Sequence, residues 1–318
     1  MMDALKKPAW SGGKKGQNLF LEILLFVGVF FASQLIAAIP VSIGAILWCL
    51  RSPDDMAVIL SGQMPQELMP LNLFSTLLVS LAVLLFCRVL QNRRPGELGL
   101  SRPRTVWEYP VGLVVGTGLF VAAIGICLAV GAVSLHTGGE MAFGMWFLFL
   151  GGFLVQGMSE EILCRGYFLG SLMRRHRPWV AILVSSAAFA LLHLFNAGVT
   201  PLALFNIFLF GVLESVYVLR RGNLWGACAI HSAWNFVQGN GFGISVSGTG
   251  QGPSPIVTSF NSRMSLWNGG SFGLEGGLAV SAVLLVAIAV LLFLVPNGKG
   301  TECAGRTDMT VRAFLSGR

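Results

Sequence analysis

The sequence predicts an all-α fold, a polytopic integral membrane protein with about eight transmembrane helices. Of its 318 residues, 54% are apolar and only 11% are charged, and the mean hydropathy is +0.74. Soluble globular domains carry about 25% charged residues. The apolar residues also gather in runs, and about 20 of them in a row are enough for a helix to cross a bilayer. These observations exclude an ordinary soluble domain.

The apolar runs, taken in order, justify the predicted number of helices. We predict spans at 19–50, 71–90, 111–135, 141–172, 179–195, 201–219, 224–237 and 274–295. The first run is longer than a signal-peptide core of about 7–15 residues, so we expect an uncleaved span. Pro40 is expected to kink this span or to mark where it leaves the hydrocarbon. Gly112 with Gly116, and Gly166 with Gly170, have the spacing that permits close helix contact.

The predicted organisation is one transmembrane domain between two polar tails. Residues 19–296 form the domain, and both tails, 1–18 and 297–318, are expected in the cytoplasm. No repeat with a period of roughly 20–50 residues is visible. The longest outside segment, 247–272, is rich in glycine and serine and is predicted to be a flexible connection. Glu275 follows it near a predicted helix start, where a carboxylate suits the helix dipole.

The basic residues are distributed as expected for a membrane protein of this topology. Eighteen of the 21 Lys and Arg residues fall in inside segments, whereas Arg51 and Arg263 fall outside and Arg165 lies within the membrane. This bias obeys the positive-inside rule, so the net charge of +7 reports topology rather than a nucleic-acid surface. The expected partners are membrane lipid and a protein or peptide substrate, with no nucleic acid. Short loops, abundant glycine and the lack of a eukaryotic sorting signal favour a bacterial cytoplasmic membrane.

Three ionisable residues inside one predicted span point to a functional site. Glu160, Glu161 and Arg165 interrupt a run that is otherwise apolar, and an ionisable group at membrane depth costs a few kcal/mol or more. Glu161 and Arg165 are four residues apart and can form an ion pair within one helix. Glu160 points about 100° away, which leaves it free to act on something in a cavity. The alternative is a structural ion-pair cluster between helices.

Three other spans carry strongly polar side chains. The fifth contains His193, and the seventh contains His231 and Asn235, which share one helix face. The sixth contains Asn206 and Glu214, eight residues apart and roughly on one face. Each side chain needs a partner within the bilayer, and the least costly arrangement gathers them around one wet cavity.

This set of side chains suits hydrolysis of a peptide bond without a covalent intermediate. A glutamate with a histidine can activate water, and His231 and Asn235 can donate hydrogen bonds to a developing oxyanion. Alternatively, Glu160, His193 and His231 could hold a zinc ion, although the His-Glu-x-x-His helix of many zinc proteases is absent. No serine or cysteine is obviously activated, and Cys164 is expected to pack in the core.

Three motifs on successive helices resemble those of the CPBP intramembrane proteases. They are Glu160-Glu161-x-x-x-Arg165, Phe189-x-x-x-His193 and His231-x-x-x-Asn235. The family includes the type II CAAX prenyl proteases and many bacterial relatives. The resemblance is strongest over a core at about 141–237, and the glycine-rich stretch at 269–275 is a possible extension of it. The resemblance implies an eight-span helical fold with a site that opens towards the cytoplasm.

The resemblance also implies roles for individual residues. Glu160 and His193 would form the water-activating pair, and His231 and Asn235 would donate to the oxyanion. Glu161, Arg165 and Phe189 would support them. Family members have been called metalloproteases and a metal-free glutamate mechanism has also been argued, so the expected cofactor is none or Zn²⁺; the missing zinc-protease helix favours none. Glu214 is not part of the motifs and is interpreted as a partner for a histidine or as a local feature.

Three functions are compatible with this pattern. The first is an intramembrane endopeptidase that cleaves a membrane-associated protein or peptide. The second is a catalytically silent relative that acts as a scaffold or immunity factor, and the third is a transporter whose Glu/His cluster relays protons. All motif positions are filled, which favours the first over the second. No inverted repeat or pair of broken helices is visible, which counts against the third.

Overall fold

A computed structural model describes residues 16–53, 56–60, 64–101, 105–138, 142–250 and 252–295. The α-helices are α1 (Leu19–Arg51), α2 (Met56–Leu60), α3 (Met69–Val89), α4 (Thr105–Ala129), α5 (Phe143–Glu161), α6 (Gly170–Met173), α7 (Pro178–Leu191), α8 (Pro201–Arg221), α9 (Trp225–Phe236), α10 (Ser265–Asn268) and α11 (Leu278–Phe293). The π-helices are η6 (Ile162–Leu169) and η7 (Val237–Gly241). The 3₁₀ turns are η4 (Pro95–Leu98), η8 (Ser262–Met264), η9 (Gly270–Phe272) and η10 (Leu274–Gly276), and the strands are β1 (Val133–Thr137) and β2 (Ile256–Phe260).

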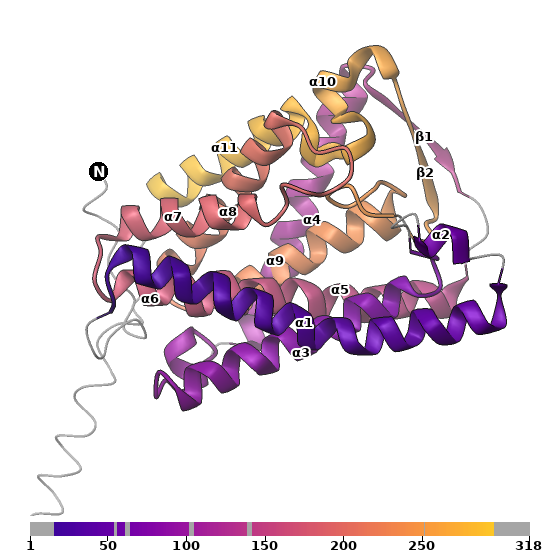
Figure 1. Ribbon diagram of the computed structural model, residues 1–318. Coiled ribbons are helices and arrows are strands. Elements are labelled where there is room, and N and C mark those ends of the chain that lie inside the picture. Colours follow the sequence, from indigo (N-terminus) through magenta and orange to yellow (C-terminus); the bar gives the residue numbers. More distant parts are fainter. Residues whose placement is uncertain are drawn as a thin grey trace, which may run out of the picture.

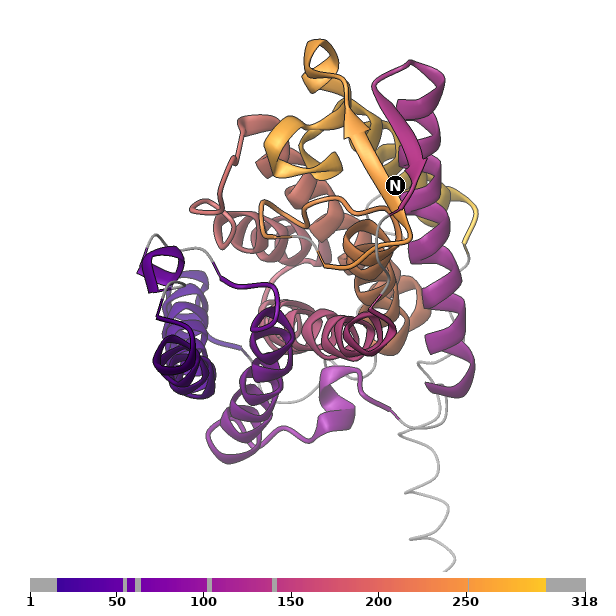
Figure 2. The ribbon, with the colours of Figure 1, turned by 90° about the vertical axis from the view of Figure 1, so that its right-hand side faces the viewer.

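The long helices pack side by side around the bundle. Starting from α1, each helix contacts the next in the order α1, α3, α5, α9, α4, α11, α8 and α7. Figure 2 shows α1 and α4 on opposite sides of the molecule, with α5 between them. The series does not follow the chain order, and it places the motif helix α5 directly against the motif helix α9 (Figure 1). The π-helix η6, which continues α5, also contacts α7 and α8.

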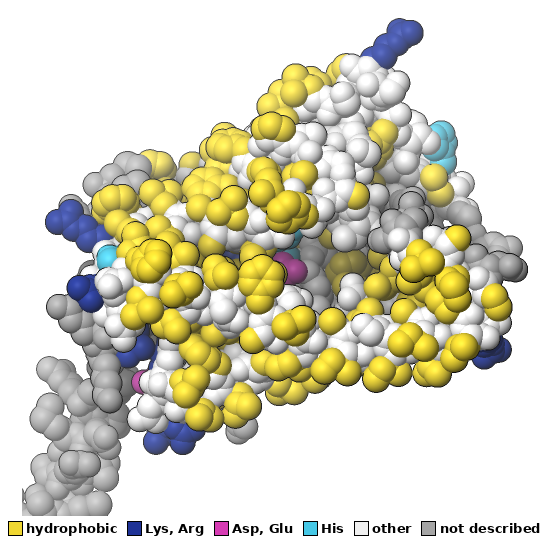
Figure 3. All heavy atoms as spheres, viewed as in Figure 1, with side chains coloured by type: hydrophobic (Ala, Val, Ile, Leu, Met, Phe, Trp, Pro, Cys, Tyr) yellow, Lys and Arg dark blue, Asp and Glu magenta, His cyan; other side chains and the backbone are white. Residues whose placement is uncertain are grey.

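The helices indicate an integral membrane protein, but the predicted count of eight spans is not confirmed. Five described helices are long and apolar enough to cross a membrane, namely 19–51, 69–89, 106–129, 143–173 and 201–221. α7 and α11 are apolar but shorter, and α9 has only 12 residues before it continues as η7. Hydrophobic side chains cover much of the outer face in Figure 3, as a lipid environment requires.

The boundaries of several predicted spans differ from the sequence-based expectation. The run 111–135 ends as helix at Ala129 and continues as β1, while the run 274–295 becomes helical only at Leu278. α1 continues through Pro40 to Arg51, so this proline does not end the helix. The predicted tail residues 1–15 and 297–318 lie outside the described residues.

The described residues of the segment 247–272, all except 251, are folded, which corrects the prediction of a flexible connection. β2 pairs antiparallel with β1, with Val133 opposite Phe260. The amide of Asn268 donates to the carbonyls of Ala132 and Asn261 at 2.8 and 3.0 Å. This pairing is not predictable from the sequence, because most of β1 falls at the end of the apolar run 111–135, which predicts a helix. A β-strand also needs a partner strand to form its hydrogen bonds, and the partner lies far away in sequence.

The glycine spacing on α4 gives the predicted close helix contact. A Cβ added to Gly116 would lie 2.9 Å from the Cα of Ile230, and one added to Gly112 would lie 2.7 Å from the Cβ of Ala229. Both neighbours are on α9, so the two glycines let α4 approach the helix that carries His231. Gly166 approaches η4 instead, because its Cβ would lie 3.2 Å from the carbonyl oxygen of Leu98.

A buried arginine binds the C-terminal half of the π-helix η6. Arg93, only 4% exposed, lies between α3 and η4. Its guanidinium donates to the carbonyl oxygens of Gly166 and Tyr167 at 3.2 and 3.4 Å and to Ser171 Oγ at 3.1 Å. Arginine has five N–H donors in a fixed fork, so one side chain can hold several carbonyls of a distorted helix.

Replacement of Arg93 by alanine is therefore expected to destabilise the bundle. Buried carbonyls of η6 would lose a charged donor, at a cost of about 3 kcal/mol. The measurement is the melting temperature in detergent, with Arg88→Ala as the control because Arg88 is exposed and donates to the side chain of Asn92 at 3.2 Å. Equal melting temperatures for the two variants would contradict a clamping role for Arg93.

Candidate active site

The site begins where α5 changes into a π-helix. Glu160 and Glu161 are the last residues of α5, and η6 starts at Ile162. A π-helix is rare and frequently occurs at functional sites. The side chain of Arg165, inside η6, reaches back to Glu161, with 2.8 Å between Nη1 and Oε1. Both side chains are fully buried, which confirms the ion pair predicted from their spacing.

Arg165 also packs against the face of an aromatic ring. Its guanidinium carbon lies 4.3 Å from the ring centre of Phe189, on α7. A cation over an aromatic face is stabilised by the ring quadrupole, and more so away from water. Phe189 also contacts both histidines, with its ring centre 4.9 Å from that of His193 and 5.9 Å from that of His231.

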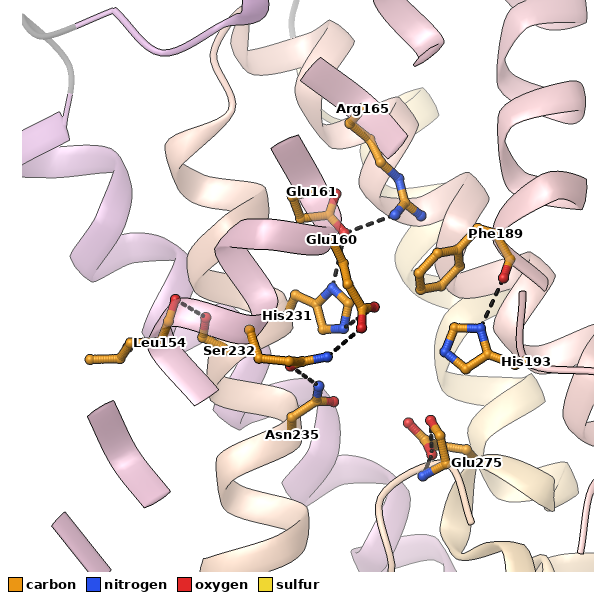
Figure 4. Close-up of polar contacts among 12 residues, drawn as sticks. Leu154, Glu160, Glu161, Arg165, Phe189, His193, His231, Ser232, Asn235 and Glu275 are labelled. Atoms are coloured by element: carbon orange, nitrogen blue, oxygen red, sulfur yellow. Dashed lines mark hydrogen bonds and ion pairs between the residues drawn. The ribbon is translucent and has the colours of Figure 1, made fainter. Parts of the chain in front are cut away.

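His231 lies between the two glutamates (Figure 4). Its Nδ1 is 2.9 Å from Oε1 of Glu161, and its Nε2 is 3.6 Å from Oε2 of Glu160. An ionised carboxylate only accepts hydrogen bonds, so Nδ1 carries a proton and the ring orientation is fixed. The ring of Phe210 packs against it at 5.2 Å. The buried pair of Glu161 and Arg165 therefore orients His231 so that Nε2 faces Glu160.

Glu160 has a partner that the sequence analysis missed. Gln156, one turn earlier on α5, donates from Nε2 to Glu160 Oε1 at 2.5 Å. Asn235 donates in turn to Gln156 Oε1 at 2.9 Å. The spacing of four residues between Gln156 and Glu160 was the signal that could have found it. The side chain of Glu160 remains 31% exposed, whereas that of Glu161 is fully buried.

His193 lies in a turn after α7, not inside a helix as predicted. α7 ends at Leu191, and the backbone N–H of His193 donates to Ala190 rather than to Phe189. The carbonyl of Phe189 is instead 2.9 Å from Nδ1 of His193. A carbonyl only accepts, so Nδ1 carries the proton and Nε2 is the ring nitrogen left for the cavity. Figure 4 shows His193 facing the cavity opposite Glu160.

One cavity of about 260 Å³ contacts all four proposed catalytic residues. It is lined from α1, α3, α5, α7, α8, α9, α11 and the segments at 246–249 and 275. The lining residues include Glu160, His193, His231 and Asn235. In Figure 3 an acidic side chain and a histidine are visible at the bottom of a hollow among hydrophobic side chains. The cavity thus gathers the polar residues that the sequence placed on separate helices.

Glu275 is a second carboxylate in the cavity, and its predicted role at a helix start was incomplete. The residue lies in η10, before α11 begins, and only 9% of it is exposed. Its Oε2 accepts hydrogen bonds from the backbone N–H and the hydroxyl of Ser247, at 2.5 and 2.8 Å. Sequence position alone could not place it here, because the contact depends on the folded segment 247–272.

Glu214 and Cys164 are both buried next to the ion pair of Glu161 and Arg165. Glu214 is fully buried on α8, and no hydrogen bond to a histidine or to any other group is found for its carboxylate within the described part of the chain. The charged groups that act on Glu214 are Glu161 and Arg165, so Glu214 lies beside this ion pair and is not a hydrogen-bond partner of a histidine. Cys164 is 1% exposed, as expected for a packing residue.

The residues proposed for zinc do not form a three-ligand site in this arrangement. Among the described residues, no group of three or more His, Cys, Asp or Glu side chains is placed to hold a metal ion. Glu160 and His231 lie together, whereas His193, with Nδ1 bonded to the carbonyl of Phe189 and Nε2 open, lies on the opposite side of the cavity (Figure 4).

Close packing of α5 on α9 sets the distance between Glu160 and His231. A Cβ on Gly157 would lie 2.7 Å from the backbone nitrogen of Ser232 and 3.0 Å from its Cα. Ser232 is next to His231, and its hydroxyl reaches the carbonyl of Leu154 at 3.4 Å (Figure 4). Only glycine allows this approach one turn before the two glutamates.

Gly157→Ala should therefore lower catalytic turnover together with stability. Overpacking typically costs about 1–3 kcal/mol, and a shift of about 1 Å at reacting groups can cost about 10²-fold in rate. The matched control is Gly144→Ala on the same helix, since a Cβ there meets nothing within 4 Å. Turnover and melting temperature of both variants are to be measured. Wild-type turnover in Gly157→Ala would show that the helix spacing does not control the site.

The fold and the site define a helical membrane protein with a buried Glu/His centre. Residues 142–237 match the family model described as type II CAAX prenyl endopeptidase Rce1-like. The match covers all three motifs, so over this segment the chain is similar to the CAAX protease-like (CPBP) family. Comparisons with curated proteins and with solved structures found no match.

Proposed function

We propose that this protein is an intramembrane endopeptidase that hydrolyses a peptide bond of a membrane-associated protein or peptide, using water activated by side chains. The observation that carries the proposal is the position of Glu160. Its carboxylate reaches the cavity next to Nε2 of His231, while a fully buried ion pair holds the other nitrogen of that ring. A carboxylate free to take a proton, beside an oriented imidazole, is the minimum set for general-base activation of water.

The first step assigned to these residues is attack of water on the scissile carbonyl. Glu160 accepts one proton of the water as its oxygen bonds to the carbonyl carbon, and the carbonyl oxygen becomes an oxyanion. Nε2 of His193, left open because Nδ1 is engaged with Phe189, can accept a hydrogen bond from the same water. The proton then passes to the leaving amine as the C–N bond breaks, so that water is divided between the two products.

His231 and Asn235 are proposed as donors to the oxyanion. His231 can donate from Nε2 only when both ring nitrogens carry a proton, and Glu160 and Glu161 lie on either side of that charge. Asn235 has a second amide N–H besides the one given to Gln156. Preorganised donors of this kind lower the barrier because they meet charge that develops only in the transition state.

The expected setting is the cytoplasmic membrane of a bacterium, with both termini and the cavity mouth on the cytoplasmic side. The charge distribution supports this orientation. Zn²⁺ dependence is the alternative for water activation, and it would require the open Nε2 of His193 to come close to Glu160 and to Nε2 of His231.

The proposal can be tested with purified protein in liposomes. The protein is incubated with a membrane-protein extract, and new peptide N-termini are identified by mass spectrometry. Wild type should create N-termini that the Glu160→Gln protein does not. A chelator and elemental analysis in parallel distinguish water activation by side chains from zinc. If wild type and Glu160→Gln yield the same N-termini, the silent scaffold is the better description.

A further inference from the structure

The wall of the cavity opposite Glu160 is built around Glu275. Figure 4 shows its carboxylate below His193, on the far side of the cavity from Asn235. Ser247 holds one carboxylate oxygen with two hydrogen bonds, and Asn196 in turn donates to the carbonyl of Ser247 at 2.8 Å. The backbone carbonyl of Glu275 accepts from Asn206 at 2.7 Å. Side chain and backbone are thus both fixed.

The local backbone is shaped to place this carboxylate. Gly269 and Gly273 have φ values of +81° and +100°, a region that L side chains rarely adopt. A Cβ on Gly273 would collide with the carbonyl oxygen of Ser245, so the segment around η10 lies directly against the segment that carries Ser247. None of these contacts is needed to begin α11, which starts only at Leu278.

The charges in the cavity are unbalanced. Among the described residues, two carboxylates, Glu160 and Glu275, line the cavity with the two histidines, and no lysine or arginine does. Arg165 is fully buried, pairs with Glu161 and does not line the cavity. Carboxylates removed from water are costly unless a cation compensates them. A ligand with a positive charge would supply the missing partner, whereas a carboxylate in the cavity would be repelled.

We propose that Glu275 forms a subsite that binds a basic side chain, lysine or arginine, of the peptide substrate close to the scissile bond. The proposal rests on the proposed endopeptidase function. Oε2 of Glu275 is held by Ser247, and the carboxylate faces the same cavity as Glu160, so the charged group of the substrate would lie across the cavity from the water-activating carboxylate. The substrate class that fits is a peptide with an internal basic residue near the cleaved bond. The cleaved bond would lie at a distance from the C-terminal carboxylate of the peptide, because the two cavity carboxylates would repel it.

The test uses one cleavable peptide in three versions, with lysine, norleucine or glutamate at each position flanking the cleaved bond. Wild type should cleave the lysine version with a kcat/KM about 10- to 100-fold above the norleucine version, the ratio expected of one hydrogen-bonded charge pair, and the glutamate version least well. Glu275→Gln, which keeps an oxygen for Ser247, should lower the ratio of kcat/KM between the lysine and norleucine versions to about one. The control is Glu67→Gln, since Glu67 is exposed and does not line the cavity.

Two results would overturn the subsite. One is a wild type without preference for lysine at any position. The other is an equal loss for all three peptides in Glu275→Gln, which would mean that Glu275 supports His193 or the cavity wall. A binding measurement does not depend on turnover: the lysine peptide should raise the melting temperature of Glu160→Gln more than the norleucine peptide does. If the lysine peptide binds selectively but wild type cleaves no peptide, the endopeptidase function is contradicted and the subsite for a cation is retained. If wild type cleaves the peptides but neither binding nor cleavage is selective for lysine, only the subsite is contradicted.

Discussion

Glu160→Gln is expected to lower kcat by about 10²–10⁴-fold with little change in melting temperature, the range typical for loss of a general base. Glutamine keeps the shape of the side chain and an oxygen to accept from Gln156, so the local hydrogen bond survives. It cannot accept the proton of the attacking water. Glu160 is also partly exposed and has no arginine partner, so its replacement leaves no buried charge behind.

The measurement is turnover per folded molecule on a peptide found by the N-terminus experiment. Circular dichroism and a melting curve report folding, and Glu67→Gln serves as the control for loss of an acidic side chain at a distance from the cavity. Turnover of Glu160→Gln within a factor of about three of wild type would contradict general-base catalysis by this carboxylate.

Helix periodicity was enough to predict contacts inside one helix. The pair of Glu161 and Arg165 followed from a spacing of four residues, and it is present although the backbone between them changes into a π-helix. The shared cavity followed from the cost of leaving polar groups alone in a bilayer. Gln156 and Glu160 have the same spacing of four residues and form a hydrogen bond. A single uncharged amide, however, does not by itself indicate a functional site in a sequence.

Contacts between segments could not be predicted in this way. His193 was expected in a helix, yet Gly198, with φ of +72°, and Pro201 follow it closely, and the chain forms 3₁₀-type turns after Leu191. The place of Glu275 depends on contacts with Ser247, which is 28 residues away in sequence. These positions result from packing among distant segments, and one sequence contains no record of which segments meet.

Replacement of Glu161 by glutamine is expected to impair both stability and catalysis. Oε1 of Glu161 accepts from Arg165 and lies 2.9 Å from Nδ1 of His231, and all three side chains are buried. A neutral amide would leave the guanidinium uncompensated in a medium of low dielectric, a change that typically costs about 3–5 kcal/mol. It would also present two N–H donors where the imidazole needs an acceptor, so the orientation of His231 towards Glu160 would be lost.

A double variant separates the two effects. Glu161→Gln alone should lower the melting temperature and the yield in membranes, and the folded remainder should turn over substrate at least about 10-fold more slowly. Addition of Arg165→Met removes the unpaired charge, so most of the stability should return. The effects of two substitutions on the free energy of unfolding are not additive when both residues take part in one interaction. Turnover should stay low in the double variant, since His231 still lacks its carboxylate. Full recovery of turnover would mean that Glu161 only compensates Arg165, and that the orientation of His231 is fixed by the rings of Phe189 and Phe210.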